Sequence, residues 1–493
     1  MKRKLFVLGI VIILIMTLLP TAALAYDSGG ETYNEHDYNA MVEFLSQPSS
    51  ATGQTNAQVL DYDIDKPETW RDVVWSLDAE KRLVEVGFAS GWYDKGLAGS
   101  LDLSNSTALE KLDCGNNQIG LLDVSRCSAL QYLACHKNRL TTLNISECPA
   151  LQQLYFNENV LTTVDISEYP ALQTLWGNEN QLKALDVSGC PALQTLQCNS
   201  NQLKALDVSG CPVLNQLECN SNQLTTLIIG ANTVLDTLDC SDNQLTSLNV
   251  SGCPKLRNLV CNENQISTLT VGANTAIDSV YCRDNRLTAL DLSGCTRLRE
   301  LICSNNHFAS LNVSANTALE YLKCSNNQLM TLDVSANTAL TAFDCSQNQL
   351  EVLDVSANTG LMSLECSQNQ LETLDLTGCT ALKNLNCCNN QLATLNVSGC
   401  AMLQILDCGH NQLATLDLTG CTALRNLGSD ASTKIKGFMG YTGDSDSSGL
   451  MILLLLLIVP VMLSVLVWFI SRRYGKDWSQ SVQSTFRRIF RRN

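Results

Sequence analysis

The chain has 493 residues, a net charge of −16 at neutral pH and 23 cysteines. A chain this acidic lacks the basic surface that nucleic-acid binding requires, so nucleic acid is excluded as a partner. The charge is unevenly placed, because Asp477 is the only acidic residue before residue 26 or after residue 448. The acidic part is therefore the long middle segment, and both ends are basic and apolar.

Residues 1–25 are predicted to be a secretory signal. A basic start at Lys2, Arg3 and Lys4 precedes an apolar run, and Ala23 and Ala25 give the small-residue pattern of a cleavage site. The alternative is a retained membrane anchor, for which the apolar run is short. The middle of the chain is expected outside the cytoplasm.

Residues 26–98 contain no repeat and are predicted to form an N-terminal cap. One stretch, "EHDYNAMVEFLSQ", has apolar residues at helical spacing, namely Tyr38, Met41, Val42 and Leu45. Farther along the chain, Trp70, Val73 and Val74 are expected to cover the open end of the repeats that begin at residue 99, because the terminal units of a repeat protein need a cap.

Residues 99–428 are repetitive, with 15 full units of 21 residues between Leu109 and Ala423. Each unit follows the pattern L-x-x-L-x-C-x-x-N-x-L-x-x-L-D-V-S-x-C-x-x, and the ninth position is always asparagine. This is the pattern of the leucine-rich repeat, in which each unit is one turn of a solenoid. We predict an α/β-type leucine-rich repeat solenoid, with a parallel β-sheet on the concave face and turns or short extended segments on the convex face.

The invariant asparagine has a physical reason. The chain bends where it leaves each strand, and this bend would leave backbone groups unpaired inside the stack. A buried amide side chain donates and accepts hydrogen bonds at once, so we expect each asparagine to satisfy the backbone of a neighbouring turn.

The repeat array resembles the internalin family, in particular its internalin J-like members with cysteine-ladder repeats. The resemblance rests on a 21-residue repeat with cysteine at position 6 followed by "LDVS", and it covers the array alone. It implies a surface protein of a Gram-positive bacterium with a role in adhesion or host contact. Members of that family are typically attached to the cell wall by a sortase signal, L-P-x-T-G; here "MGYTG" (439–443) matches it without the proline.

The cysteines form two columns. Position 19 is cysteine in nine units, and Cys388 lies in neither column. Position 6 is cysteine in 13 units, at Cys114, Cys135, Cys198, Cys219, Cys240, Cys261, Cys282, Cys303, Cys324, Cys345, Cys366, Cys387 and Cys408. Parallel Cα–Cβ bonds keep neighbours in a column too far apart for disulfides, and a ladder does not converge on a metal ion or on a catalytic base. We therefore predict buried, reduced thiols that act as small apolar filler, and no cofactor.

Positions 3 and 5 alternate with the inward residues of each strand, so they are expected on the concave face. Two clusters there are predicted to bind ligand, the first at Tyr132, Tyr155 and Trp176 and the second at Val260, Tyr281, Ile302 and Tyr321. Exposed aromatic residues are typical anchors for protein or glycan partners, although aromatic residues also favour strands for packing reasons. Beside the first cluster, Phe156 and Gly177 replace cysteine at position 6, which indicates volume compensation.

After the repeats, residues 429–448 are interpreted as a short polar stalk and residues 449–470 as one transmembrane helix, since they are uncharged and long enough to span a bilayer. Residues 471–493 form a basic tail, which places this end in the cytoplasm; the tail is either a helix on the inner leaflet or solvated. The localisation predicted is a single-pass plasma-membrane protein with its N-terminal domain outside, with sortase attachment to the cell wall as the alternative.

No set of acid, base and nucleophile recurs, so the chain is not predicted to be an enzyme. The sequence instead predicts a cell-surface protein that binds protein or glycan ligands through its concave face. The alternative is a structural scaffold of the bacterial cell envelope. The membrane that anchors the protein is a further predicted partner, which the protein contacts through its C-terminal helix.

Overall fold

The computed structural model describes residues 25–51, 53–88, 95–438 and 441–443. They divide into two compact units, the first ending at Gln349 and the second beginning at Leu350. In these ranges no helix is both long and apolar enough to cross a membrane. The predicted transmembrane helix (449–470), the basic tail (471–493) and all but the last residue of the predicted signal (1–25) lie outside the described residues.

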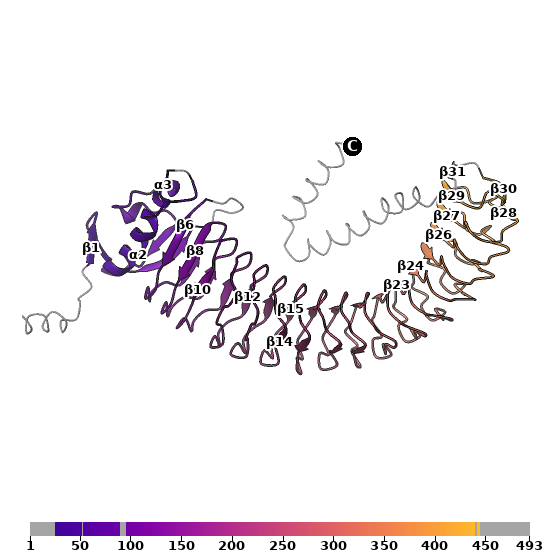
Figure 1. The fold of residues 1–493 in the computed structure, drawn as a ribbon, viewed down its shortest axis with the longest axis horizontal. Coiled ribbons are helices and arrows are strands. Elements are labelled where there is room, and N and C mark those ends of the chain that lie inside the picture. The colour runs from indigo at the N-terminus through magenta and orange to yellow at the C-terminus, as the bar shows by residue number, and fades with distance from the viewer. Residues whose placement is uncertain (1–24, 52, 89–94, 439–440, 444–493) are drawn as a thin grey trace, which may run out of the picture. The chain divides into compact units, whose positions relative to one another are not determined.

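The first compact unit is built on a parallel sheet to which each repeat contributes one strand, formed by positions 3 to 5. Neighbouring strands pair without a shift, so Leu133 faces Leu154 and Leu154 faces Leu175. Figure 1 shows these strands following one another along one side of the stacked turns. The strands are β7 (Lys111–Asp113), β9 (Tyr132–Ala134), β11 (Gln153–Tyr155), β12 (Thr174–Trp176), β13 (Thr195–Gln197), β15 (Gln216–Glu218), β17 (Thr237–Asp239), β19 (Asn258–Val260), β21 (Ser279–Tyr281), β22 (Glu300–Ile302), β23 (Tyr321–Lys323) and β24 (Ala342–Asp344).

The opposite side of the first unit carries turns and a few short strands, as predicted. These strands pair in parallel with their equivalents in the next turn. They are β6 (Ala98–Asp102), β8 (Gln118–Asp123), β10 (Thr142–Asn144), β14 (Ala205–Asp207), β16 (Thr226–Ile228), β18 (Ser247–Asn249) and β20 (Thr268–Thr270).

The N-terminal cap extends the sheet of the first unit. Strand β5 (Leu83–Gly87) pairs in parallel with β7, and β3 (Val73–Trp75) pairs antiparallel with β5. Trp70 and Val73 are buried as predicted, whereas the prediction for Val74 was wrong, because alternation along β3 leaves Val74 49% exposed. The other elements are β1 (Ala25–Ser28), β2 (Glu31–Asn34), α2 (Glu35–Ser46), α3 (Asn56–Leu60), the 3-10 helix η1 (Pro67–Thr69) and β4 (Glu80–Lys81).

Helix α2 confirms the predicted amphipathic helix and is fixed by a buried ion pair. Tyr38, Met41 and Leu45 are buried on its inner face. Asp37 is also fully buried; its carboxylate accepts from Arg82 Nε at 2.7 Å and from the backbone N–H of Leu83 at 3.0 Å. These two contacts tie the helix to the start of β5.

The second compact unit continues the same architecture. Its sheet strands are β25 (Ser363–Glu365), β26 (Asn384–Asn386), β27 (Ile405–Asp407), β29 (Asn426–Gly428) and β31 (Tyr441–Gly443), and β28 (Thr415–Asp417) pairs with β30 (Lys434–Lys436) behind them. Strands β30 and β31 lie within residues 429–448, so the structure contradicts the predicted stalk for residues 429–438 and 441–443. This segment is a degenerate sixteenth turn. Its hydrogen bonds hold it on the stack although its composition is polar.

Asp430 shows why this last turn stays in place. Its carboxylate accepts from the backbone N–H of His410 at 2.7 Å and of Asn411 at 3.1 Å. Farther along, the Thr433 hydroxyl donates to the carbonyl of Leu413 at 3.0 Å. These side chains take the place of backbone groups that a following repeat supplies elsewhere, and they cap the stack.

The asparagine ladder is confirmed. In a typical repeat, Asn285 Nδ2 donates to the carbonyls of Cys261, Cys282 and Arg283, and its Oδ1 accepts from the N–H of Ile266. Two of these four partners belong to the preceding turn. Each buried amide therefore closes the bend of its own repeat and joins that repeat to the one before.

The residue before each asparagine has a left-handed backbone. At position 8, φ lies between 51° and 56° in all 15 repeats, and none of these residues is glycine. Left-handed backbone is costly for such residues unless the surroundings impose it. The ladder of position 9 supplies that constraint, and it turns the side chains of position 8 outward in every repeat.

Candidate functional site on the sheet face of the first unit

The seven residues predicted to bind ligand lie on the outward-facing positions of the sheet. Each is partly exposed, whereas the leucine or valine between positions 3 and 5 is buried. The first cluster comes from β9, β11 and β12, and the second comes from β19, β21, β22 and β23. Both clusters belong to the first compact unit.

The first cluster is a contiguous set of three rings. The Tyr132 and Tyr155 ring centroids are 5.5 Å apart and tilted, and Tyr155 meets Trp176 edge to face at 5.0 Å. The Lys111 ammonium lies 5.8 Å from the Tyr132 centroid. Burial raises the pKa of Tyr132 to about 12, so its hydroxyl stays protonated. Trp176 Nε1 is covered and has no hydrogen-bond partner among the described residues.

The core beneath the first cluster confirms the predicted volume compensation. A Cβ atom at Gly177 would lie 2.4 Å from Phe156 Cζ, which no real contact allows. The Phe156 ring, itself fully buried, thus occupies the space that a cysteine fills in other repeats. Phe156 lies in the same turn as Tyr155, the middle member of the aromatic cluster on the outside.

The second cluster surrounds a carboxylate. Glu300 on β22 is paired in register with Tyr321 on β23, and the Tyr281 hydroxyl donates to the Glu300 carboxylate. On the same strand as Tyr321, Lys323 Nζ lies 5.4 Å from the Tyr321 centroid. Val260 and Ile302 complete the cluster on neighbouring strands. Sequence reasoning misses Glu300 because position 3 is polar in most repeats.

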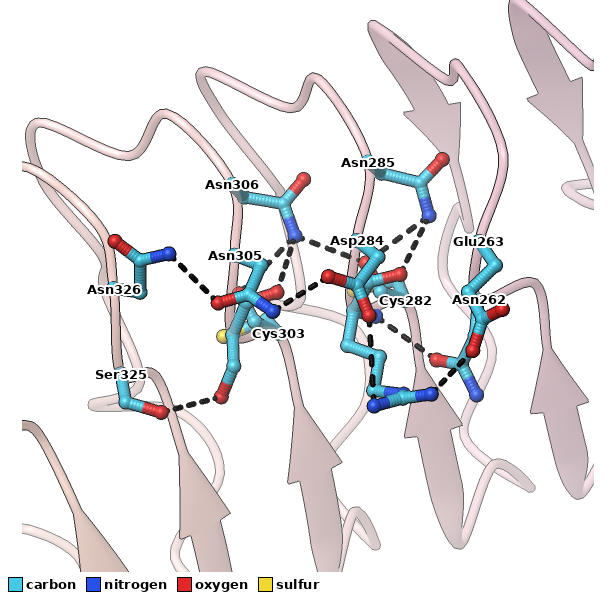
Figure 2. Close-up of polar contacts among 12 residues, drawn as sticks. Asn262, Glu263, Cys282, Asp284, Asn285, Cys303, Asn305, Asn306, Ser325 and Asn326 are labelled. Atoms are coloured by element: carbon cyan, nitrogen blue, oxygen red, sulfur yellow. Dashed lines mark hydrogen bonds and ion pairs between the residues drawn. The ribbon is translucent and has the colours of Figure 1, made fainter.

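A row of polar side chains runs along the ends of these strands (Figure 2). Asn326 donates to Asn305 at 2.9 Å, and Asn305 donates to Asp284 at 2.5 Å. Arg283 then pairs with both Asp284 and Glu263. These links join four consecutive turns at the ends of the strands that carry the second cluster.

Between the clusters the surface is polar and acidic. Gln197 and Glu218 are nearly buried and accept hydrogen bonds from Asn178 and Asn199, at 3.1 and 3.2 Å. Asp239 follows in the next turn, and burial raises the pKa of its carboxyl. The sheet face therefore carries two aromatic clusters separated by carboxylates and amides.

Position 6 forms a column of thiols behind the sheet, which we call the strand-side column. Every cysteine in it is buried, and burial raises the thiol pKa, for example to about 12 for Cys198. None of the 23 cysteines, all of which lie in the described part of the chain, forms a disulfide. In the described part of the chain, no group of three or more potential ligands is placed to hold a metal ion.

Position 19 forms a second column, which we call the turn-side column, and its chemistry differs from the prediction. Cys148 Sγ donates to the carbonyl of Val124 in the preceding turn at 3.1 Å, and Cys211 donates in the same way to Val187 at 3.4 Å. In another repeat asparagine stands at this position, and Asn316 Nδ2 donates to the carbonyl of Leu292 at 3.0 Å. These thiols are hydrogen-bond donors that link successive turns, not simple filler.

This linkage accounts for the residue types that stand in place of cysteine at position 19. Tyr169, at the same position, also donates its hydroxyl to the carbonyl 24 residues earlier, that of Ile145. Cysteine, asparagine and tyrosine share a donor at the end of the side chain. The sequence contains the signal, because all the residues found at position 19 are donors, but the acceptor is visible only in the stack.

Comparisons with known proteins agree with this fold. No family model matches the chain, and no curated protein matches it either. A solved structure of the functional domain of InlJ from Listeria monocytogenes, described as including a cysteine ladder, is 31% identical; the match covers 62% of this chain and 66% of InlJ, with a TM-score of 0.49. The chain thus spans just under two thirds of that relative.

Two other solved structures share the architecture. A leucine-rich repeat protein of Leptospira interrogans is 25% identical over 65% of this chain and 84% of its own, with a TM-score of 0.50. A plant peptide hormone receptor, RGFR1 in complex with RGF2, is 19% identical over 72% of this chain and 71% of its own, with a TM-score of 0.53. The second of these likenesses concerns the fold alone.

Proposed function

We propose that this internalin-like leucine-rich repeat protein is a cell-surface binding protein that captures a protein or glycan ligand on the sheet face of its first unit, at Tyr132, Tyr155 and Trp176. The observation that carries the proposal is the contiguity of these three rings on the outward side of adjacent strands. Large, partly exposed aromatic residues on a rigid sheet lose little conformational entropy on binding and serve as anchors.

A general protein-binding role is supported by the comparisons, since a solved neighbour holds a peptide hormone. The solenoid itself supplies stacked strands held by backbone and asparagine hydrogen bonds, so the rings are positioned before any ligand arrives. Binding, and not catalysis, is what such a preformed surface of aromatic and polar side chains accomplishes.

The test is capture by the purified full-length protein. Immobilised wild type and a variant with Tyr132→Ser, Tyr155→Ser and Trp176→Ser are exposed to host-cell surface extract and, separately, to envelope extract of the source organism. We expect the variant to lose capture. A control variant, Val213→Ser with Ile228→Ser and Met330→Ser, removes three exposed apolar side chains elsewhere and should capture like wild type.

The result also separates the two candidate functions. Capture of host material supports adhesion, and capture restricted to the organism's own envelope supports the structural scaffold. Equal capture by wild type and the aromatic variant, with circular dichroism melts unchanged, would contradict the proposed site. Plasma-membrane anchoring through residues 449–470, or sortase attachment, stays part of the proposal and is checked by fractionating cells that express the full chain.

A further inference from the structure

We infer that the second cluster is a receptor for a cationic side chain, preferably arginine, of a protein ligand. The inference rests on the proposed binding function and specifies the chemistry of a second contact. It starts from Glu300, a partly exposed carboxylate on the sheet face with a tyrosine on each side. In the described part of the chain, Glu300 forms no ion pair with any lysine, arginine or histidine.

The surroundings of Glu300 suit a guanidinium group. The Glu300 carboxylate accepts a hydrogen bond from the Tyr281 hydroxyl. Because a carboxylate has about four lone-pair sites, it can accept further hydrogen bonds. Tyr281 and Tyr321 lie on its two sides. A guanidinium pairs with a carboxylate through two parallel hydrogen bonds and stacks on aromatic rings, so it uses both features together.

The protein itself shows that a cation is accepted here. Lys323 Nζ lies 5.4 Å from the centre of the Tyr321 ring, within the range of a cation–π contact. Lys323 has no ion pair among the described residues, and its in-register neighbour on β24 is Asp344. The Lys323 charge also repels an incoming cation. Removing it should therefore strengthen binding, whereas removing the Glu300 charge should weaken it.

The flanking charges favour a positive ligand. Asp239 and Asp344 lie on the same row of outward positions, on β17 and β24, and neither forms an ion pair in the described part of the chain. Their close hydrogen-bond partners are the serines two residues on, Ser241 and Ser346. Two carboxylates that flank the cluster add long-range attraction for a basic segment and raise its association rate.

The polar row of Figure 2 keeps this receptor rigid. Arg283 is the nearest basic residue along the strand from Tyr281, and its charge is neutralised by Glu263 and Asp284. A free arginine at this place would compete with the ligand for Glu300. The ion pairs therefore hold Arg283 at the edge and leave the carboxylate available.

The experiment measures binding of fluorescent nonapeptides to the purified full-length protein by thermophoresis. The probes alternate glycine with arginine, lysine or glutamate. Wild type is expected to bind the arginine probe most tightly and the glutamate probe not at all. Glu300→Gln, which keeps the acceptor for Tyr281, should weaken the arginine probe about tenfold, and Lys323→Met should strengthen it several-fold.

A matched control removes the same charge from the opposite side. Asp291 is exposed and caps Ser293 in a turn where other repeats carry asparagine, so Asp291→Asn should leave the fold and the affinity unchanged. Equal affinity of Glu300→Gln and Asp291→Asn, or no binding of the arginine probe to wild type, would overturn the inference. The first-cluster variant should bind the probe normally, so failure here is distinct from failure of the proposed function.

Discussion

The strand-side and turn-side columns contain the same residue type in different roles. At the strand-side column cysteine is replaced by Phe156 and Gly177, which have no donor side chain, and the pair preserves volume. At the turn-side column it is replaced by asparagine and Tyr169, which preserve a donor. The residues that a position accepts in place of cysteine thus show what the thiol does there.

The backbone explains the difference. Behind the sheet, successive turns are already joined by backbone hydrogen bonds, such as the N–H of Cys198 to the carbonyl of Glu218 at 2.9 Å. The thiol adds little to this link: Cys198 Sγ also lies 3.6 Å from the Glu218 carbonyl, but that carbonyl already accepts the backbone N–H. On the turn side, the carbonyl of Val124 accepts the N–H of Cys127 within its own repeat, and the Cys148 thiol of the next repeat uses its second lone pair. The side chain is one of the links between turns.

Exchange of cysteine for asparagine should separate the two columns most strongly. Cys282→Asn buries an amide without a partner in a full space, so we expect a loss of about 3 kcal/mol or more in the free energy of unfolding. Cys211→Asn, in the repeat before the one that carries Asn232, should cost less than about 1 kcal/mol because a donor to the Val187 carbonyl is retained. Denaturant unfolding of the full chain measures both losses of stability, and equal losses would contradict the different roles of the two columns.

The Phe156 and Gly177 pair tests whether volume is the sole requirement at the strand-side column. Gly177→Cys restores the repeat pattern but collides with the Phe156 ring, so it should cost about 1–3 kcal/mol. Phe156→Cys alone should leave a cavity and cost about 3 kcal/mol. The double variant should recover most of both losses. Simple additivity in thermal melts would show that the two positions are not coupled.

The end of the stack tests the value of a side-chain link. Asp430 accepts two backbone N–H groups that have no following repeat to serve them. Asp430→Ala should cost about 1–2 kcal/mol and increase hydrogen exchange at His410 and Asn411. The matched Asp333→Asn variant changes an exposed turn position at which other repeats carry asparagine. It should leave hydrogen exchange at His410 and Asn411 unchanged. Protection retained in Asp430→Ala would argue against the cap.

Cys388 lies in neither column and should give the smallest effect. It is partly exposed, and burial, with the nearby Asp407 carboxylate, raises its thiol pKa to about 11. Because thiolate is the reactive form, alkylation of the native protein should begin at Cys388, and its rate should rise about tenfold per pH unit below that pKa. Mass spectrometry after brief iodoacetamide treatment identifies the site, and faster labelling of either column would contradict their burial.

Much of the fold could be predicted from the repeat, because its period, its leucines and its invariant asparagine each have a local physical reason. The parallel sheet and the asparagine hydrogen bonds were predicted correctly. The left-handed backbone at position 8 was not, because residues as different as Lys137 and Ser200 adopt it and no side chain signals it. The leucine spacing fails in residues 429–438 and therefore predicts a stalk, although Asp430 and Thr433 hold this segment in the stack.

The candidate site was likewise predicted only in part. The outward positions of Tyr132, Tyr155 and Trp176 were predicted from the alternation of a strand, whereas their ring contacts and the carboxylate of Glu300 between two tyrosines were not. The sequence by itself determined which residues recur and which face they share, because a repeat imposes one conformation on every turn. Tertiary structure decided which side chains of neighbouring turns meet, because those contacts join residues about 20 positions apart in the chain, whose distance is fixed only when the turns stack.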